Sequence, residues 1–139
     1  MRLRKNAKVE LIRGVPLFEH LSRRDLDRVA SIADEIDLPE GKELTREGGP
    51  GREFFVLIEG DADVRKNNRR INRLGPGDFF GEIALVTDRP RTATVVAETP
   101  VRALVVTARN FKRLLEQQPE IQGKVLSAIA ARLSPDDDV

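Results

Sequence analysis

Apolar and polar positions follow two different periods along this chain, and the changes of period divide it into three parts. In residues 1–35 the apolar positions have helical spacing, and Ser22 with Asp25 three residues later has the pattern of a capping box. In residues 36–107 short apolar segments are separated by Gly and Pro, which is typical of strands joined by turns. After residue 108 the helical period returns. The pattern predicts an α+β protein, mainly β, in which helices flank a sandwich, roll or barrel.

The strands of the central part differ in the burial that their sequences predict. Residues 54–58 are almost continuously apolar, so this strand should be buried on both faces. Residues 61–66 mix charged and apolar positions and predict an edge-like strand. The pair Asn67 and Asn68 predicts the hairpin turn that follows, and residues 71–74 form the returning strand.

The C-terminal part predicts two helices that are separated at Pro119. Each helix has one apolar face, formed by Phe111, Leu114 and Leu115 in the first and by Ile121, Val125, Ile129 and Leu133 in the second. Residues 134–139 are rich in Asp and predict a disordered tail. We expect one domain, with residues 1–35, 36–107 and 108–133 as its helical, β and helical parts.

Composition removes several classes of function. A chain of 139 residues can bury one core of its own, and the absence of Cys excludes disulfides, thiolate metal sites and iron–sulfur clusters. His20 is the only histidine, so a multi-histidine metal site is excluded too. The formal net charge of +1 indicates no nucleic-acid footprint, and no apolar run reaches the length of a membrane span. We expect a cytoplasmic monomer without nucleic-acid or membrane partners.

The candidate chemistry lies in residues 77–95. Residues 81–86 suit a helix start, where free amides and partial positive charge can hold an anion, and Gly81 permits close approach. Arg91 stands where a loop enters the strand expected over residues 92–97, and a guanidinium matches two phosphate oxygens. Glu82 would repel a bare phosphate but can accept hydrogen bonds from hydroxyls. These residues point to a ribose phosphate.

The segments 80–85 and 90–94 resemble the phosphate-binding cassette of cyclic nucleotide-binding domains, in a version closer to protein kinase A regulatory subunits than to the bacterial catabolite activator. The resemblance implies an antiparallel β-roll, also called a double-stranded β-helix or jelly roll, and cAMP or cGMP as ligand with no metal. It implies that Glu82 holds the ribose 2′-hydroxyl and Arg91 the cyclic phosphate. By the same resemblance, Phe80 belongs to the cassette and the amides of Gly81, Ile83, Ala84 and Ala93 line the pocket.

Other site residues follow from aligning outward from the cassette. Val64, Ile71 and Leu74 fall where the family lines the base with aliphatic side chains, although core packing alone would also explain them. The family uses its last helix as a lid over the base, which makes Leu126, Ile129, Arg132 and Leu133 candidates for the lid. Thr92 can contact the phosphate or the guanine amino group, which permits cGMP, while the general resemblance favours cAMP.

The function expected is that of a regulatory sensor whose C-terminal helices move when the nucleotide binds. No second domain is visible, so we expect a protein effector in trans or in a longer parent chain. The alternative is a β-roll that has lost its ligand and acts as a protein interaction domain, against which the retention of Glu82 and Arg91 argues. An enzyme is not expected, because no nucleophile–base pair or metal cluster can be assembled around the cassette. A DNA-binding regulator is disfavoured by the near-zero net charge and the missing recognition helix.

Overall fold

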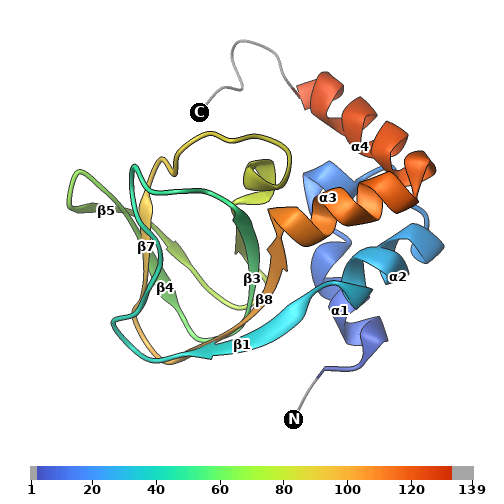
Figure 1. Ribbon diagram of the computed structural model, residues 1–139. Helices are drawn as coiled ribbons and strands as arrows, with labels where there is room; N and C mark the ends of the chain where they lie inside the picture. Colours follow the sequence, from blue (N-terminus) through green and yellow to red (C-terminus); the bar gives the residue numbers. More distant parts are fainter. Residues whose placement is uncertain (1–2, 133–139) are drawn as a thin grey trace.

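The computed structural model describes the backbone of residues 3–132 and the side chains of residues 3–130, and it has a β-roll with the α-helices gathered on one side (Figure 1). The N-terminal helices are α1 (Lys5–Ile12), the 3-10 helix η1 (Pro16–Phe18) and α2 (Arg23–Ser31). The roll contains β1 (Asp34–Leu38), β2 (Glu43–Thr45), β3 (Glu53–Glu59), β4 (Ala62–Lys66), β5 (Arg69–Leu74), β6 (Phe79–Phe80), β7 (Thr94–Ala97) and β8 (Val101–Thr107). A second 3-10 helix, η2 (Glu82–Leu85), lies between β6 and β7, and the chain continues into α3 (Ala108–Gln117) and α4 (Pro119–Arg132).

The strands form two antiparallel four-stranded sheets, in the orders β1-β8-β3-β6 and β2-β7-β4-β5. This architecture confirms the α+β fold class with an antiparallel β-roll and flanking helices. In β3, Phe54 and Val56 belong to the core shared with the helices, whereas Leu57 belongs to the core inside the roll. All three are at most 1% exposed, so the prediction that this strand is buried on both faces is confirmed.

The position of β4 differs from the prediction of an edge strand, which was wrong. β4 pairs with β5 on one side and with β7 on the other, so it is an internal strand. Its central carboxylate, Asp63, is only 3% exposed and forms ion pairs with Arg65 at 3.3 Å and Arg70 at 3.2 Å. The charged positions of this segment thus reflect ion pairs on the outer face of the sheet. The sequence of residues 61–66 does not indicate that β7, about thirty residues later in the chain, pairs with this strand.

The turn between β4 and β5 follows the local sequence closely. Asn67 and Asn68 have φ values of 52° and 64°, the left-handed conformation that type I′ hairpin turns require and that Asn tolerates better than most residues. The register of the hairpin shifts between Val64 and Arg65, where Ile71 is the extra residue of β5. The predicted hairpin is therefore confirmed, with a bulge that the sequence did not indicate.

Aromatic contacts join the helices to the roll. The ring centroid of Phe18 in η1 lies 6.0 Å from that of Phe54 in β3 and 5.9 Å from that of Phe111 in α3. Ile121 and Val125 of α4 are buried in the same cluster, and α4 packs against η1 and α3. The N-terminal and C-terminal helices therefore share one core, which the outer face of β3 completes.

The buried carboxylate of Asp25 ties α2 to α4. As predicted, Ser22 and Asp25 form both halves of a capping box. Asp25 is 3% exposed, and Lys124 of α4 donates to its Oδ2 at 2.6 Å. Burial alone would raise the pKa of Asp25, but the hydrogen bonds from Lys124 and Ser22 outweigh it, and the pKa is lowered from its usual 3.8.

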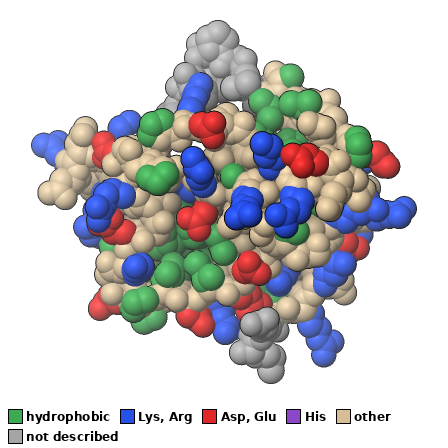
Figure 2. Space-filling model, viewed as in Figure 1, with side chains coloured by type: hydrophobic (Ala, Val, Ile, Leu, Met, Phe, Trp, Pro, Cys, Tyr) green, Lys and Arg blue, Asp and Glu red, His purple; other side chains and the backbone are tan. Residues whose placement is uncertain are grey.

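Two further observations concern the molecule as a whole. Basic and acidic side chains are interspersed on the face shown in Figure 2. Within residues 3–132 no helix is both long and apolar enough to cross a bilayer. The candidate lid residue Leu133 and the predicted tail lie outside the described residues.

We predict that Asp25→Asn lowers the free energy of unfolding at neutral pH by roughly 1.5–3 kcal/mol, because it removes the charge that Lys124 pairs with. The lowered pKa means that this contribution is complete above the usual pKa and is lost as pH falls through the lowered value. The wild type should therefore lose more stability than the variant between ~pH 5 and ~pH 2, as urea denaturation would measure.

Asp27→Asn is the matched control on the same helix. Asp27 forms a more exposed pair with Arg23 at 3.4 Å, so its removal should change stability by less than about 0.5 kcal/mol. Equal effects of the two substitutions would show that the buried pair makes no special contribution.

Candidate functional site

The candidate site begins where β6 ends. Phe80 pairs with Phe55 of β3 and their rings stack, with centroids 5.0 Å apart and an interplanar angle of 18°. The chain then turns at Gly81, whose φ of 83° lies in the left-handed region that favours glycine. The first hydrogen bond of η2 runs from the Ala84 amide to the Gly81 carbonyl at 3.0 Å. The turn expected as an α-helix start is thus a four-residue 3-10 helix.

Arg91 lies directly against this turn. A Cβ atom built on Gly81 would lie 2.3 Å from Arg91 Nη1 and 2.7 Å from the Glu53 carbonyl oxygen. Arg91 Nη2 donates a hydrogen bond to that same carbonyl, at the start of β3. Glycine at position 81 is therefore a requirement for the guanidinium to lie beside η2.

A glycine-rich loop holds Arg91 from its other side. The Arg91 amide donates to the Gly49 carbonyl at 2.9 Å, and the Gly48 amide donates to the Arg91 carbonyl at 2.8 Å. A Cβ on Gly51 would lie 3.1 Å from both Cδ and Nε of Arg91. No spacing in the sequence indicated that this loop packs against Arg91.

The guanidinium of Arg91 is half-buried and therefore only partly hydrated. Burial lowers the pKa of the guanidinium, while the negative charge of Glu53 opposes this shift. Arg91 Nε is buried and has no hydrogen-bond partner among the described residues. Because an unpaired buried donor is costly, an anion that accepts from Arg91 would be bound favourably here.

Glu82 connects the site to the N-terminal helices. Its Oε2 accepts a hydrogen bond from the Leu17 amide of η1 at 3.2 Å. Its side chain is half-buried beside the turn that carries Gly81. The sequence predicted a hydroxyl partner for this carboxylate and gave no indication of Leu17, which is 65 residues away.

The sequence relationships agree with this geometry, since residues 35–118 match the sequence model of the family described as "Cyclic nucleotide-binding domain". The chain belongs to the cyclic nucleotide-binding domain family. The match contains the cassette with η2, the helix α3, and all of the roll but the first residue of β1. The family is a regulatory one that binds nucleotides, not a catalytic one.

Individual relatives give the same result. The chain is 35% identical to a cAMP-dependent protein kinase regulatory subunit of Mycosarcoma maydis over 91% of this chain and 27% of that protein. It resembles the crystal structure of the N-terminal domain of a transcriptional regulator from Streptomyces coelicolor A3(2), with a TM-score of 0.81, 29% identity, and coverage of 93% of this chain and 96% of that one. It also resembles the structure described as "cAMP bound PfPKA-R (141-441)", with a TM-score of 0.67 and 28% identity. That similarity covers 91% of this chain and 47% of the other. The chain spans about a quarter of the length of the curated kinase subunits it matches.

The remaining cassette residues surround the turn with different exposure. Ile83 is 42% exposed and Thr92 is exposed, whereas Ala84 is buried. Ala93 is half-buried, and its carbonyl accepts a hydrogen bond from Thr45 Oγ1 at 3.3 Å. The Ala84 amide already donates to Gly81, so it could reach a phosphate only by sharing that hydrogen bond.

Of the three residues expected to line the base, Val64 and Leu74 lie together inside the roll and Ile71 does not. Val64 and Leu74 border the core inside the roll, and Leu74 is 8% exposed. Ile71 lies at the bulge of β5 and is 58% exposed, so its contact with a base remains a prediction. The bulge makes Asn72 the cross-strand partner of Val64, on the same face of the sheet. Asn72 is a candidate that sequence reasoning missed, because a bulge leaves no mark in the hydrophobic period.

The last helix lies apart from this wall. Ile121, Val125 and Ala128 of α4 are buried in the helical core, whereas Leu126 is 57% exposed. The side chain of Arg132 lies outside the described residues. The lid that was expected from the family resemblance is therefore not formed in this structure, where α4 packs against η1 and α3 (Figure 1).

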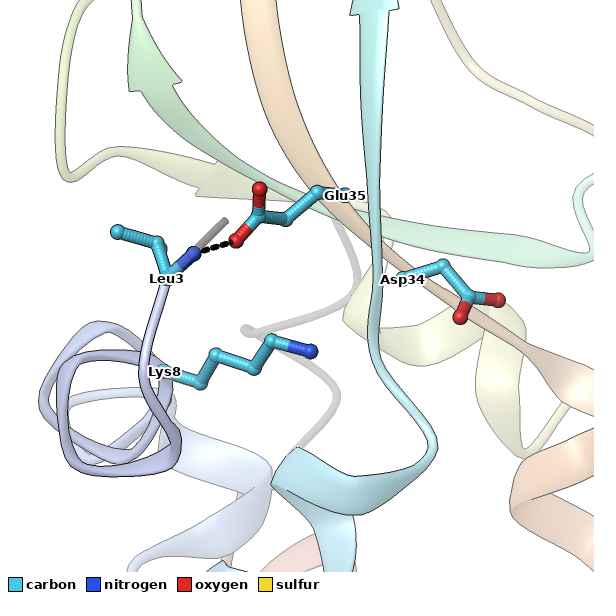
Figure 3. Close-up of a pocket in the computed structure, with 4 residues that line it drawn as sticks. All are labelled: Leu3, Lys8, Asp34 and Glu35. Carbon is cyan, nitrogen blue, oxygen red and sulfur yellow. Dashed lines mark hydrogen bonds between the residues drawn. The ribbon is translucent and has the colours of Figure 1, made fainter. Parts of the chain in front are cut away.

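Other cavities and clusters do not extend the site. Figure 3 shows a cavity of about 260 Å³ beside β1, where the Leu3 amide donates to the carboxylate of Glu35. Lys8, which also lines it, donates to the Ala33 carbonyl at 2.8 Å. These contacts tie the N-terminal segment to β1, away from the cassette. In the part of the chain that the structure describes, no group of three or more His, Cys, Asp or Glu side chains could hold a metal ion.

We predict that Gly81→Ala lowers the free energy of unfolding and displaces the Arg91 guanidinium. The left-handed backbone costs about 1–2 kcal/mol for a residue with a Cβ, and the Glu53 carbonyl oxygen, a backbone atom 2.7 Å from the added Cβ, increases that cost. Gly77→Ala is the matched control, because its φ of 88° imposes a similar strain but nothing lies within 4 Å.

Urea denaturation would compare the two variants, and the NMR signal of Arg91 Nε would report displacement. Only Gly81→Ala should shift that signal. An unshifted signal in Gly81→Ala would show that the guanidinium does not lie against residue 81.

Proposed function

We propose that this chain binds a cyclic purine mononucleotide in the cassette formed by η2 and Arg91, and that it acts as a regulatory sensor module. The observation that carries the proposal is the half-buried guanidinium of Arg91, held between Gly51 and Gly81 with its Nε unpartnered among the described residues. A phosphate with one negative charge would supply the missing acceptors. The Ile83 amide near the start of η2 would add a main-chain donor on the facing side.

The ribose is assigned to Glu82. A carboxylate can accept from the 2′-hydroxyl with the strength of a charged hydrogen bond. Because Glu82 Oε2 already accepts from the Leu17 amide, the ribose would share or displace that contact. The ligand thereby gains a direct connection to η1.

The base is assigned to the inner face of the roll near Val64, Leu74 and Asn72. Aliphatic side chains suit a purine face, and an amide can read its polar edge. We favour cAMP, because relatives are described as cAMP-dependent or cAMP-bound. The exposed Thr92 leaves cGMP as the alternative.

Signal transfer would run through the shared helical core. Leu85 of η2 is buried in the same cluster as Phe111 and Leu114 of α3, so tightening of the cassette around phosphate would press on α3. Release of Leu17 would loosen η1, against which α4 packs. Both effects favour a movement of α4 toward the base, and binding and movement are then linked thermodynamically. The effector would lie in trans or in a longer parent chain.

We predict that wild-type protein releases or absorbs heat on titration with cAMP, and that Arg91→Ala weakens binding by about 2–5 kcal/mol. Arg69→Ala, at the exposed start of β5, is the control and should bind like wild type. Calorimetry with cAMP and cGMP makes the comparison. Absence of heat with both nucleotides at high micromolar concentration would reject the proposed ligand class, and unchanged affinity of Arg91→Ala would remove Arg91 from the site.

The movement of α4 gives a second prediction. On addition of cAMP, amides of residues 121–132 should become more protected from hydrogen exchange as α4 settles over the base. The Leu17 amide should become less protected as Glu82 turns to the ribose. The control is Arg91→Ala at the same nucleotide concentration, which should bind little cAMP and should show neither change in protection. Protection confined to η2 and β7 would reject movement of α4 while leaving nucleotide binding intact.

A further inference from the structure

The tip of the β4–β5 hairpin projects past the end of β7 (Figure 1). The ladder between β4 and β7 ends at the pair Arg65 and Thr94. β4 and β5 continue to pair beyond it, at Lys66 and Arg69. The bulge at Ile71 lies where this projecting part begins, and a bulge is a point at which a strand bends. The direction of the tip therefore depends on what holds it from outside the sheet.

The side chain of Glu47 holds the tip. Its Oε1 atom accepts a hydrogen bond from the Asn67 amide at 3.0 Å, across 20 residues of sequence. Asn67 is one of the two turn residues with positive φ, so the turn itself fixes the direction of this amide. A carboxylate is a stronger acceptor than a neutral group. Both residues are exposed, so the contact orients the tip without contributing to the hydrophobic core.

The backbone of Glu47 belongs to the loop that holds Arg91. The Glu47 amide donates to Thr94 Oγ1 at 2.9 Å, and the next amide, that of Gly48, donates to the Arg91 carbonyl at 2.8 Å. The Arg91 amide donates in return to the Gly49 carbonyl at 2.9 Å. Glu47 thus connects the hairpin tip, through its side chain, with the strand segment of Arg91, through its loop.

We propose that Glu47 is a positioning residue that sets the separation between the phosphate-binding guanidinium and the wall that receives the base. Under the proposed function, on which this role rests, Arg91 binds the phosphate, and Val64 and Asn72 of the hairpin receive the base. One ribose joins phosphate and base, so both can be contacted together only when hairpin and cassette lie at a matching distance. With the tip held, the base meets a wall that is already ordered. With the tip released, the ligand must order the hairpin as it binds, which costs affinity.

The test compares cAMP with ribose 3′,5′-cyclic phosphate, which lacks the base. Glu47→Ala removes the carboxylate and keeps the backbone contacts with Thr94 and Arg91. We expect it to bind cAMP about three- to tenfold more weakly than wild type in calorimetry. Its affinity for the base-free ligand, measured by NMR titration of the ¹⁵N-labelled full chain, should change by less than about twofold. Glu47→Gln keeps an oxygen acceptor and should restore most of the affinity for cAMP.

Glu43→Ala is the matched control, because Glu43 is an exposed carboxylate of the same segment that pairs with the neighbouring Arg46 at 2.8 Å. It should bind both ligands like wild type. Unchanged affinity of Glu47→Ala for cAMP would overturn the positioning role. An equal loss for both ligands would overturn it too, because Glu47 would then act through the phosphate contact.

A second measurement needs no ligand. In the free protein, Glu47→Ala should speed hydrogen exchange of the Asn67 amide and leave the NMR signal of Arg91 Nε in place. A displaced Arg91 signal would overturn the role, since Glu47 would then support the loop instead of the hairpin. Failure of the wild type to bind either ligand would reject the nucleotide site itself. Wild-type binding without a base-dependent loss in Glu47→Ala would reject only the role of Glu47.

Discussion

The candidate site depends on the burial of one guanidinium. Arg91 can lie against η2 only because Gly51 and Gly81 lack side chains, and because the Glu53 carbonyl accepts one of its donors. The loop around Gly49 fixes the backbone of Arg91 from the other side. A cation held in this way loses part of its hydration, and protein groups replace only some of the lost hydrogen bonds, which is why an anion would be bound favourably beside it.

The same turn is part of the hydrophobic core that unites the helices. Leu85 of η2 packs in the cluster of Phe18, Phe54 and Phe111, which places the candidate binding turn in one packed unit with α1, η1, α2, α3 and α4. Since closely packed interiors transmit displacements instead of absorbing them, a shift of η2 by phosphate must be accommodated by its neighbours. Glu82 adds a polar connection from the same turn to η1.

Features governed by neighbouring residues were predictable from the sequence, and features governed by distant pairing were not. The capping box of Ser22 and Asp25, the positive φ of Asn67 and Asn68, and the two buried faces of β3 all follow local rules. Gly81 and Arg91 were predicted to belong to one phosphate site, and the structure places Arg91 against Gly81. By contrast, the internal position of β4, the bulge at Ile71 and the contact of Glu82 with Leu17 require knowledge of which remote segments meet. The 3-10 form of η2 also escaped prediction, because its few residues suit either kind of helix.

The sheet that contains β4 and the helical half of the molecule are stabilised by different interactions on their outer and inner faces. The outer face of this sheet carries a network in which Arg65, Arg70 and Arg73 alternate with Asp61, Asp63 and Glu98. The helical half is held mainly by aromatic and aliphatic burial around Phe18. Dissolved salt screens the exposed members of an ion-pair network and leaves apolar burial intact or strengthens it. Ionic strength therefore weakens the exposed ion pairs of this sheet, whereas the apolar packing of the helices is kept.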